Sequence, residues 1–407
     1  MHISGGRTFK GCAVFVLSGV LGVCLLLTAL GMDHTIRVTL PPPTGPFAVG
    51  RATYTWRDAV HADTMAPVPG TKRELLVWIW YPAASVQSSE AAEYLPAAWR
   101  TALERKMGVL LTKFLTRDLS RVRAHSFLDP GVSPKLRSYP VVLMRAGLAA
   151  LTTDYTTLAE HLASHGYVVV GFDAPYRSIV VVLPDGTTVE RARQNDADLL
   201  VGAAQEQLGI KLVQAWSADM NFALDQLGHL NASDASGKFL GRLDMQRVGA
   251  FGHSLGGATA LQFCHDDARC KAGIDIDGAP LGNAITDGVT QPFLFLLGDH
   301  SREPVPETRQ VEANIRSIYD RLAGDRRLEL LIRGANHFGF SDDGALLKNH
   351  IVMGALRMFG VVGMDGRRQL SATAYCVRAF FDAYLKGSGV SRPKISSPLY
   401  PEIQVRE

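Results

Sequence analysis

A serine between two glycines is the residue of this chain whose surroundings best suit a nucleophile. The pentapeptide Gly252-His-Ser-Leu-Gly256 follows the apolar run 248–251, which predicts a buried strand, and precedes residues with helical spacing. A strand, G-x-S-x-G and a helix in this order form a nucleophile elbow, where the serine lies on a strained turn and the glycines admit neighbouring backbone. The pattern therefore predicts that Ser254 attacks an acyl carbon. The competing interpretation is a glycine-rich turn with a solvated serine.

A serine hydroxyl at neutral pH needs a general base, and the base needs an acid that orients it. In folds with a nucleophile elbow, the three residues follow in the order serine, acid, histidine. His337 fits the place of the base, because a predicted strand and a glycine turn precede it in residues 328–337. His300, which follows the end of another predicted strand, is its rival.

Three aspartates are candidates for the acid. Asp275 and Asp277 flank Ile276 in a predicted strand, so alternation directs both side chains to the same face. Asp277 lies at the carboxyl end of that strand, and Asp299 lies at the end of the next one. We expect Asp275 to be a hydrogen-bonded strand residue, whereas periodicity does not rank Asp277 against Asp299.

Acyl transfer also needs backbone N–H groups that stabilise the oxyanion of the tetrahedral intermediate. The amide of Leu255, directly after the serine, is expected to be one donor. Leu148 is expected to supply the other, because Gly147 lets the loop after the predicted strand 140–144 turn toward the serine. The sequence shows no metal-ligand or cofactor motif, and this chemistry needs neither.

Apolar runs that alternate with helical stretches must position these residues. The predicted strands are residues 74–81, 140–144, 167–172, 248–251, 272–276, 293–297 and 328–332. The predicted helices are residues 94–119, 153–164, 216–230, 311–323 and 370–386. Fully apolar strands between helices indicate a mostly parallel sheet with helices on both faces, where ligands bind at the carboxyl ends of the strands. We expect one α/β domain over residues 51–407.

Charge argues against one class of partner. The 407 residues carry a formal net charge of +3 at pH 7, and no cluster of lysine and arginine stands out. Proteins that bind nucleic acid through its phosphates present a strongly basic surface. We therefore expect no nucleic-acid partner.

The amino-terminal residues predict a membrane segment. Residues 11–31 contain no charged side chain, and Arg7 and Lys10 precede them in a basic segment, 1–10. About 20 apolar residues can span a bilayer, and basic residues before them favour keeping that end inside. We expect an uncleaved anchor; the alternative is a signal peptide cleaved at Ala29-Leu30-Gly31. Either one, followed by a proline-rich linker over residues 32–50, places the main domain outside the cytoplasm, at the cell membrane or secreted.

Cys264 and Cys270 are candidates for a disulfide. Cys264 is expected near the end of the helix after Ser254 and Cys270 just before the next strand, so a bridge would close a short loop. Disulfides persist in oxidising compartments, which agrees with a domain outside the cytoplasm. The spacing lacks the histidines or paired cysteines of a zinc site. Cys376, in a helical pattern, is expected to be a buried apolar residue.

Taken together, five blocks of the chain resemble the platelet-activating-factor acetylhydrolase family, of the plasma and intracellular type II kind. These blocks are Pro43–Gly50, Leu76–Pro82, Leu162–Val169, the nucleophile and acid segments Gly252–Ala258 and Cys270–Asp277, and the histidine segment Ile332–Phe338. They extend over most of the chain from about residue 41 onward, so the resemblance is specific in combination. It implies an α/β-hydrolase fold.

The resemblance also implies roles for individual residues. The family places its acid at the end of the strand that follows the nucleophile helix, which implies Asp277 over Asp299. It implies oxyanion donors at Leu148 and Leu255. This chain departs from the family in the oxyanion loop, where Arg145-Ala146-Gly147 replaces the usual His-Gly.

Members of the family hydrolyse short or oxidised acyl chains at the second glycerol position of phospholipids. The resemblance therefore implies a serine ester hydrolase that acts on a small-molecule or lipid ester. The alternatives are a generic short-chain esterase or lipase, an acyltransferase with the same triad, and a non-catalytic membrane-tethered binding protein.

Overall fold

The structure is a computed structural model. It describes residues 17–29, 31–32, 36–84, 86, 89–109, 112, 118–300, 306–346, 363–387, 393 and 395–406. Within these residues, a 12-stranded sheet runs in the order β1-β5-β2-β3-β7-β6-β10-β11-β12-β13-β14, with β4 paired to β5. The six strands β7, β6, β10, β11, β12 and β13 are parallel to one another. Strand β3 pairs antiparallel with β2 and β7, and β14 pairs antiparallel with β13.

The parallel strands carry the apolar runs seen in the sequence. They are β6 (Tyr139–Arg145), β7 (Val168–Asp173), β10 (Leu243–His253), β11 (Cys270–Ile276), β12 (Phe293–Leu297) and β13 (Arg327–Ile332). The outer strands are β1 (Val38–Thr39), β2 (Val49–Ala62), β3 (Lys72–Pro82), β4 (Ala91–Glu93), β5 (Val122–Leu128) and β14 (Ile403–Arg406). A separate hairpin pairs β8 (Val180–Val182) with β9 (Thr188–Glu190).

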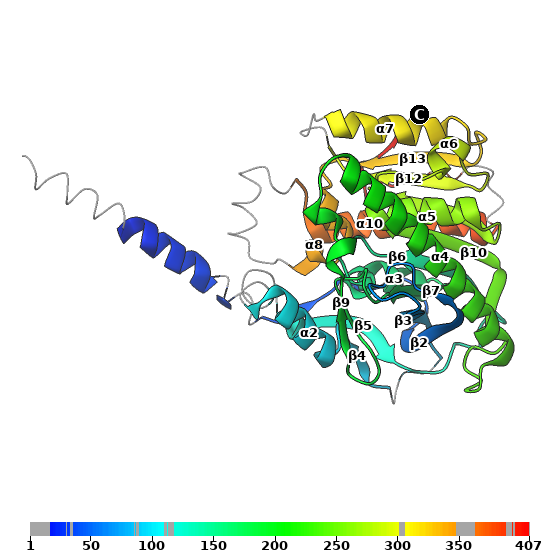
Figure 1. Cartoon of the computed structure of the whole chain (residues 1–407), viewed down its shortest axis with the longest axis horizontal. Helices are drawn as coiled ribbons and strands as arrows, with labels where there is room; N and C mark the ends of the chain where they lie inside the picture. The colour runs from blue at the N-terminus through cyan, green and yellow to red at the C-terminus, as the bar shows by residue number, and fades with distance from the viewer. Residues whose placement is uncertain are drawn as a thin grey trace, which may run out of the picture.

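Helices cover both faces of the sheet (Figure 1). They are α2 (Ala97–Met107), α3 (Thr156–Ser164), α4 (Ala203–Ser233), α5 (Leu255–Asp266), α6 (Ala284–Asp287), α7 (Pro306–Tyr319), α8 (Asp343–Leu346) and α10 (Gly366–Leu385). Short 3-10 turns are η2 (Leu119–Arg121), η3 (Thr152–Tyr155), η4 (Arg193–Asn195), η5 (Ala197–Leu199) and η6 (His337–Phe340).

Alternation along the strands divides the core into two layers. In β6, Val142 and Met144 pack in the cluster that contains side chains of α3 and α10. Val141 and Leu143 pack in the opposite cluster, with side chains of α4, α5 and α7. Because side chains alternate between faces and both faces are covered by helices, every residue of β6 is buried. The predicted mostly parallel α/β architecture is confirmed.

Helix α2 is shorter than the sequence predicted. We expected a helix over residues 94–119, but α2 ends at Met107. Gly108 has φ 87°, a conformation that residues with a Cβ rarely adopt, and it ends the helix. The apolar spacing continued past this point and hid the break.

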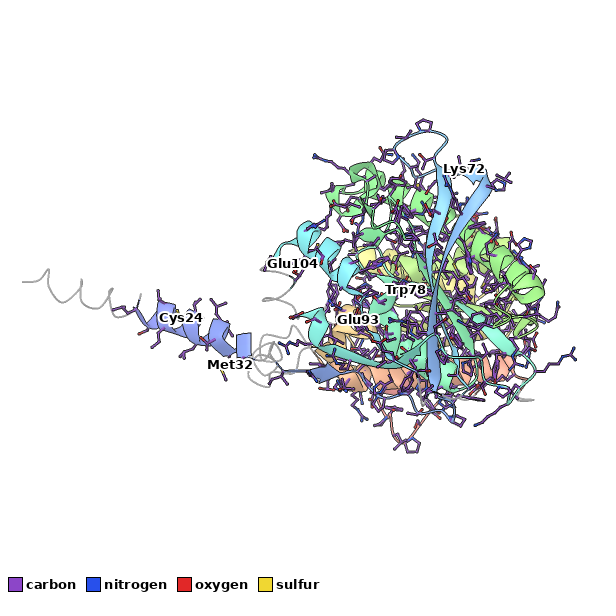
Figure 2. All side chains as sticks on the ribbon, turned by 90° about the horizontal axis from the view of Figure 1, so that it is seen from below. Cys24, Met32, Lys72, Trp78, Glu93 and Glu104 are labelled. Atoms are coloured by element: carbon purple, nitrogen blue, oxygen red, sulfur yellow. A yellow bond between two sulfur atoms is a disulfide. The ribbon has the colours of Figure 1, made fainter. Side chains whose placement is uncertain are left out.

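The amino-terminal prediction lies partly outside the described residues. Residues 17–29 are helical, and Figure 2 shows Cys24 and Met32 on a segment that stands apart from the body containing Trp78. No helix in the part of the chain that the structure describes is long and apolar enough to cross a membrane. The basic segment, the anchor or signal peptide and the linker stay predictions.

Cys264 and Cys270 form a disulfide in the structure, at a Cα–Cα distance of 5.1 Å. The bridge joins the last turn of α5, the helix after Ser254, to the first residue of β11, the strand that leads to Asp277. Cys376 is buried in α10. The disulfide thus ties together the two elements that carry the serine and an acid.

Removal of this disulfide should lower stability. A Cys264→Ser/Cys270→Ser variant is expected to lose about 2 kcal/mol of unfolding free energy, because the short loop it closes restricts the unfolded chain. Urea denaturation of the variant and the oxidised wild type measures the difference. Wild type treated with a reductant serves as the control and should approach the variant. Equal midpoints for all three samples would show that the bridge contributes nothing.

Candidate active site

The backbone at Ser254 has the strained conformation of a nucleophile elbow. Ser254 has φ 57° and ψ −127°, between the end of β10 and the start of α5. Its N–H donates to the carbonyl of Ile276 at 2.9 Å, which ties the turn to β11. A non-glycine residue with positive φ costs free energy that the surrounding structure must supply, and such residues concentrate at functional sites.

The two glycines that flank this turn have no room for a Cβ atom. A Cβ on Gly252 would lie 2.0 Å from the carbonyl oxygen of Gly256. A Cβ on Gly256 would lie 2.2 Å from the carbonyl oxygen of Arg145, at the end of β6. Both distances are far below van der Waals contact, so only glycine lets the helix and the strand end approach this closely. The half-buried Ser254 side chain therefore stands at the carboxyl ends of the strands.

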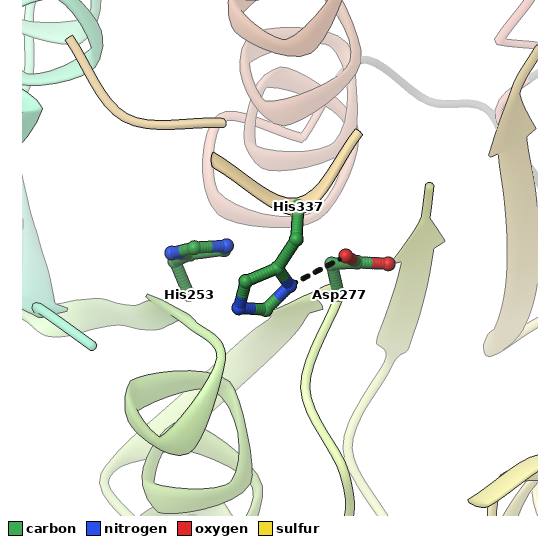
Figure 3. Close-up of side chains that lie close together, drawn as sticks. All are labelled: His253, Asp277 and His337. Atoms are coloured by element: carbon green, nitrogen blue, oxygen red, sulfur yellow. Dashed lines mark hydrogen bonds and ion pairs between the residues drawn. The ribbon is translucent and has the colours of Figure 1, made fainter. Parts of the chain in front are cut away.

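Asp277 and His337 are hydrogen-bonded to each other. Asp277 follows the last residue of β11, and His337 begins η6 in the loop after β13. The Nδ1–H of His337 donates to Asp277 Oδ2 at 2.7 Å, as Figure 3 shows. The side chain of Asp277 is 1% exposed and that of His337 is 34% exposed. This arrangement leaves Nε2 of the imidazole available for a proton, as a general base requires.

Two further donors hold the carboxylate of Asp277. The N–H of Gly298 and the Nε2–H of His300 both donate to Oδ1, at 2.7 and 2.9 Å. Burial opposes ionisation of Asp277, but the hydrogen bonds from His300 and His337 outweigh it and hold the pKa below the ordinary value. The carboxylate stays ionised at neutral pH. His300, the rival candidate for the base, is thus bound to Asp277.

The other two aspartates have different partners. Oδ2 of Asp299 accepts the N–H of Gly334 at 2.8 Å, which joins the loops after β12 and β13. Asp275 is buried, and its Oδ1 accepts the N–H of Gly278 at 2.9 Å. Burial raises the pKa of Asp275 well above its ordinary value. Only Asp277, of the three candidates, shares a described hydrogen bond with His337.

His253 lies beside His337 and Tyr155 lies beside His253, and no motif in the sequence places them there. The rings of His253 and His337 lie with centroids 4.4 Å apart (Figure 3). The O–H of Tyr155 donates to Nδ1 of His253 at 2.7 Å. Burial, and then the neighbouring His337, lower the pKa of His253 to about 3, so its ring is neutral. No spacing in the sequence relates Tyr155 to the elbow 98 residues later.

His253, Asp277 and His337 are also the described residues whose arrangement could hold a metal ion. Their ligand atoms lie within 4.8 Å of one another. However, Nδ1 of His337 and Oδ2 of Asp277 bind each other, and Nδ1 of His253 binds Tyr155. These three hydrogen-bonded atoms suit a general base and an acid that orients it, whereas Nε2 of His253 is buried without a described hydrogen-bond partner.

The loop after β6 reaches the serine. A Cβ on Gly147 would lie 3.4 Å from Cβ of Ser254, so this residue is adjacent to Ser254. Leu148 follows, and its N–H donates no hydrogen bond to another described residue. Leu255 begins α5, where the first amides of a helix have no intrahelical acceptor. Among the described residues, the amides of Leu148 and Leu255 thus have no hydrogen-bond acceptor.

Arg145, the departure from the family pattern, is buried beneath this loop. Its guanidinium donates to the carbonyl of Phe172 at 2.7 Å and lies 3.9 Å from the ring centroid of Trp216. Burial lowers its pKa to about 10, which leaves the side chain charged at neutral pH. The guanidinium therefore binds groups in the protein core. Hydrogen-bond donors for an oxyanion would have to come from the backbone of the loop.

The platelet-activating factor acetylhydrolase, isoform II family matches residues 32–386 of the chain. The chain belongs to this family. A platelet-activating factor acetylhydrolase from Cavia porcellus is 24% identical over 351 residues, which cover 78% of this chain and 71% of that protein. A probable 1-alkyl-2-acetylglycerophosphocholine esterase from Arthroderma benhamiae is 23% identical over 412 residues, covering 95% and 99%.

The chain also resembles a solved esterase structure in its fold. The solved structure of a ferulic acid esterase from Streptomyces cinnamoneus superposes with a TM-score of 0.72 and 26% identity, and covers 91% of this chain and 99% of that one. Acetylhydrolase, esterase and ferulic acid esterase are all ester-hydrolysing activities. The chain is an ester-hydrolysing enzyme with the α/β-hydrolase fold, which removes the non-catalytic alternative.

Proposed function

We propose that this enzyme hydrolyses carboxylic esters with Ser254 as nucleophile, His337 as general base and Asp277 as the orienting acid. The observation that carries the proposal is the 2.7 Å bond between His337 and the ionised Asp277, beside a serine with φ 57°. The described contacts include no hydrogen bond between Ser254 and His337. Such bonds are often long without substrate and tighten in the complex, which is consistent with the assignment.

In the proposed mechanism, Ser254 Oγ bonds to the acyl carbon while its proton passes to Nε2 of His337. The amides of Leu148 and Leu255 stabilise the oxyanion. The intermediate then collapses, the ester C–O bond breaks, and the proton on His337 leaves with the alcohol. Water attacks the acyl-enzyme by the same route, which releases the carboxylic acid and restores Ser254.

We propose as substrate a phospholipid with a short or oxidised acyl chain at its second glycerol position. The names of the two relatives, a platelet-activating factor acetylhydrolase and a probable 1-alkyl-2-acetylglycerophosphocholine esterase, support this class. A cavity of about 200 Å³ borders the loop that follows Leu148 and is of a size for a small acyl group. Its described lining includes Leu151 of that loop, Met107 of α2, Ile179 before β8 and Leu346 of α8.

The acyl-length dependence tests this substrate class. We expect kcat/KM for p-nitrophenyl esters to be highest for acetate or butyrate and to fall steeply beyond, since one methylene that a pocket cannot hold costs about 10- to 200-fold. An alkyl-glycerophosphocholine with a 2-acetyl group should likewise be preferred to its 2-palmitoyl form. A flat profile, or a preference for long chains, would instead favour a generic esterase or lipase. Parallel reactions with added alcohol detect acyl transfer.

We also propose that the catalytic domain works outside the cytoplasm. Its support is the disulfide between Cys264 and Cys270 and the uncharged residues 11–31 behind a basic segment. Fractionation of cells that express the full chain tests it. Recovery in the cytosol with both thiols reduced would contradict the proposal, whereas recovery with membranes or in the medium separates an anchor from a cleaved signal.

A further inference from the structure

The polar backbone groups around Leu148 have well-defined partners. The N–H of Gly147 donates to the hydroxyl of Tyr155 at 3.3 Å, and the carbonyl of Gly147 accepts the N–H of Ala150 at 3.2 Å. The carbonyl of Leu148 accepts a hydrogen bond from Nη2 of Arg191 at 2.8 Å. The N–H of Leu148 is left without a described acceptor. The described hydrogen bonds therefore hold the loop on both sides of the Leu148 amide.

Arg191 comes from a separate part of the chain, directly after β9. Its side chain is 6% exposed, and its Nη1 forms ion pairs with Asp196 at 2.8 Å and with Asp198 at 3.6 Å. Its backbone N–H donates to the carbonyl of Ile179, which anchors it to the residue before β8. The guanidinium is thus held by two carboxylates at one end while its other end reaches the oxyanion loop.

A charged donor suits this task. Hydrogen bonds from arginine to an oxygen are shorter and stronger than those between neutral groups, and the planar guanidinium directs its two ends at fixed angles. Once the carbonyl of Leu148 is pinned, rotation of the neighbouring peptide planes is restricted. An oxyanion donor stabilises the transition state only if it already points at the developing charge, because reorientation during the reaction costs free energy.

We propose that Arg191 is a positioning residue for catalysis: it binds the carbonyl of Leu148 and so holds the Leu148 amide in the oxyanion hole. The inference rests on the proposed Ser254 mechanism. Arg191 touches no reacting atom, and it acts through the loop. Arg145, the last residue of β6, is engaged by Phe172 and Trp216 and donates no described hydrogen bond to Leu148. The side-chain hydrogen bond to the carbonyl of Leu148 comes instead from Arg191, in a segment distant in the sequence.

The inference predicts a specific kinetic pattern. Arg191→Met keeps the volume and removes the hydrogen bond, and it should lower kcat about 10- to 100-fold, less than the full loss of an oxyanion donor. KM should stay within about threefold, because substrate binding precedes formation of the oxyanion. A trifluoromethyl ketone forms a tetrahedral oxyanion on serine. Its inhibition constant should therefore rise by the same factor by which kcat/KM falls. Arg191→Lys, which keeps the charge, should recover part of kcat.

Arg193→Met is the matched control, because Arg193 is exposed and lies in the adjacent turn η4. Full-length variants are compared for melting temperature, kcat, KM and inhibition by the ketone. An unchanged kcat in Arg191→Met would overturn the inference. So would a loss of kcat without a matching loss of ketone affinity, or an equal loss in Arg193→Met. If Arg191→Met fails to fold, Arg191→Lys replaces it in the test. The inference then requires that kcat and ketone affinity of Arg191→Lys fall by the same factor. Failure of a fluorophosphonate to label wild-type Ser254 would instead refute the proposed mechanism itself.

Discussion

Replacement of Ser254 with alanine should lower kcat for a short-chain ester by about four to six orders of magnitude, since members of a catalytic triad act as a unit. The variant should also lose all labelling by a fluorophosphonate, because no other hydroxyl lies in the strained elbow. Its fold should be retained, since glycine at 252 and 256 creates the close contacts and the serine side chain does not. Initial rates, mass spectrometry after labelling, and melting temperature measure the three outcomes.

Ser236→Ala is the control for this experiment. Ser236 is exposed in the turn after α4, outside the elbow, and should keep wild-type turnover and labelling. A double variant, Ser254→Ala with His337→Ala, should be no slower than Ser254→Ala alone, because the base has no role without its nucleophile. Intact labelling of Ser254→Ala would show that another residue is the nucleophile. Additive losses in the double variant would show that the two residues act independently.

The sequence was sufficient for the elements whose signal is local. The apolar runs of β6, β11, β12 and β13 correspond closely to the predicted strands, because burial on both faces demands uninterrupted apolar residues. The elbow was predictable for a related reason: Gly252 and Gly256 are needed by contacts within a few residues and with one neighbouring strand. The serine, the histidine loop and the free Leu255 amide follow from such local rules.

The rest of the site depends on contacts between distant segments. Asp277 and Asp299 follow neighbouring parallel strands, so the alternation of side chains does not distinguish them. They differ in their partners, because Asp277 binds His337 and Asp299 binds Gly334. His300 met the sequence criteria for a base, yet its Nε2 binds Asp277. Tyr155 and Arg191 fix the oxyanion loop from separate parts of the chain. Pairings of this kind leave no periodic trace in a single sequence.

Replacement of the acid should have the second largest effect. Asp277→Asn is expected to lower kcat about 10⁴-fold, as the loss of charge and of the correct histidine tautomer does in other triads. The carboxylate of Asp277 accepts hydrogen bonds from His337, His300 and Gly298. An amide offers one acceptor oxygen and an NH₂ group that would face a donor, so His337 would lose its orientation. The variant should also lose the stability that the ionised carboxylate provides.

That stability has a defined pH dependence. The hydrogen bonds hold the pKa of Asp277 below its ordinary value, so its contribution is present above the unfolded pKa of about 4 and is lost as pH falls through the folded pKa. The gap in unfolding free energy between wild type and Asp277→Asn should therefore be full at pH 7 and shrink below about pH 4. Chemical denaturation at a series of pH values measures it, and a gap that widens in acid would contradict the assigned direction.

Asp299→Asn is the matched substitution that separates the two acids. Asp299 accepts the N–H of Gly334, and an asparagine oxygen can accept the same bond. We expect its kcat to stay within about fivefold of wild type, with a stability loss of about 1 kcal/mol, the size of one altered hydrogen bond. Because both substitutions remove one charge at the ends of adjacent strands, a general electrostatic effect would slow both enzymes alike. A nearly inactive Asp299→Asn beside an active Asp277→Asn would reverse the assignment, since the group that orients His337 must be the one whose charge the reaction needs.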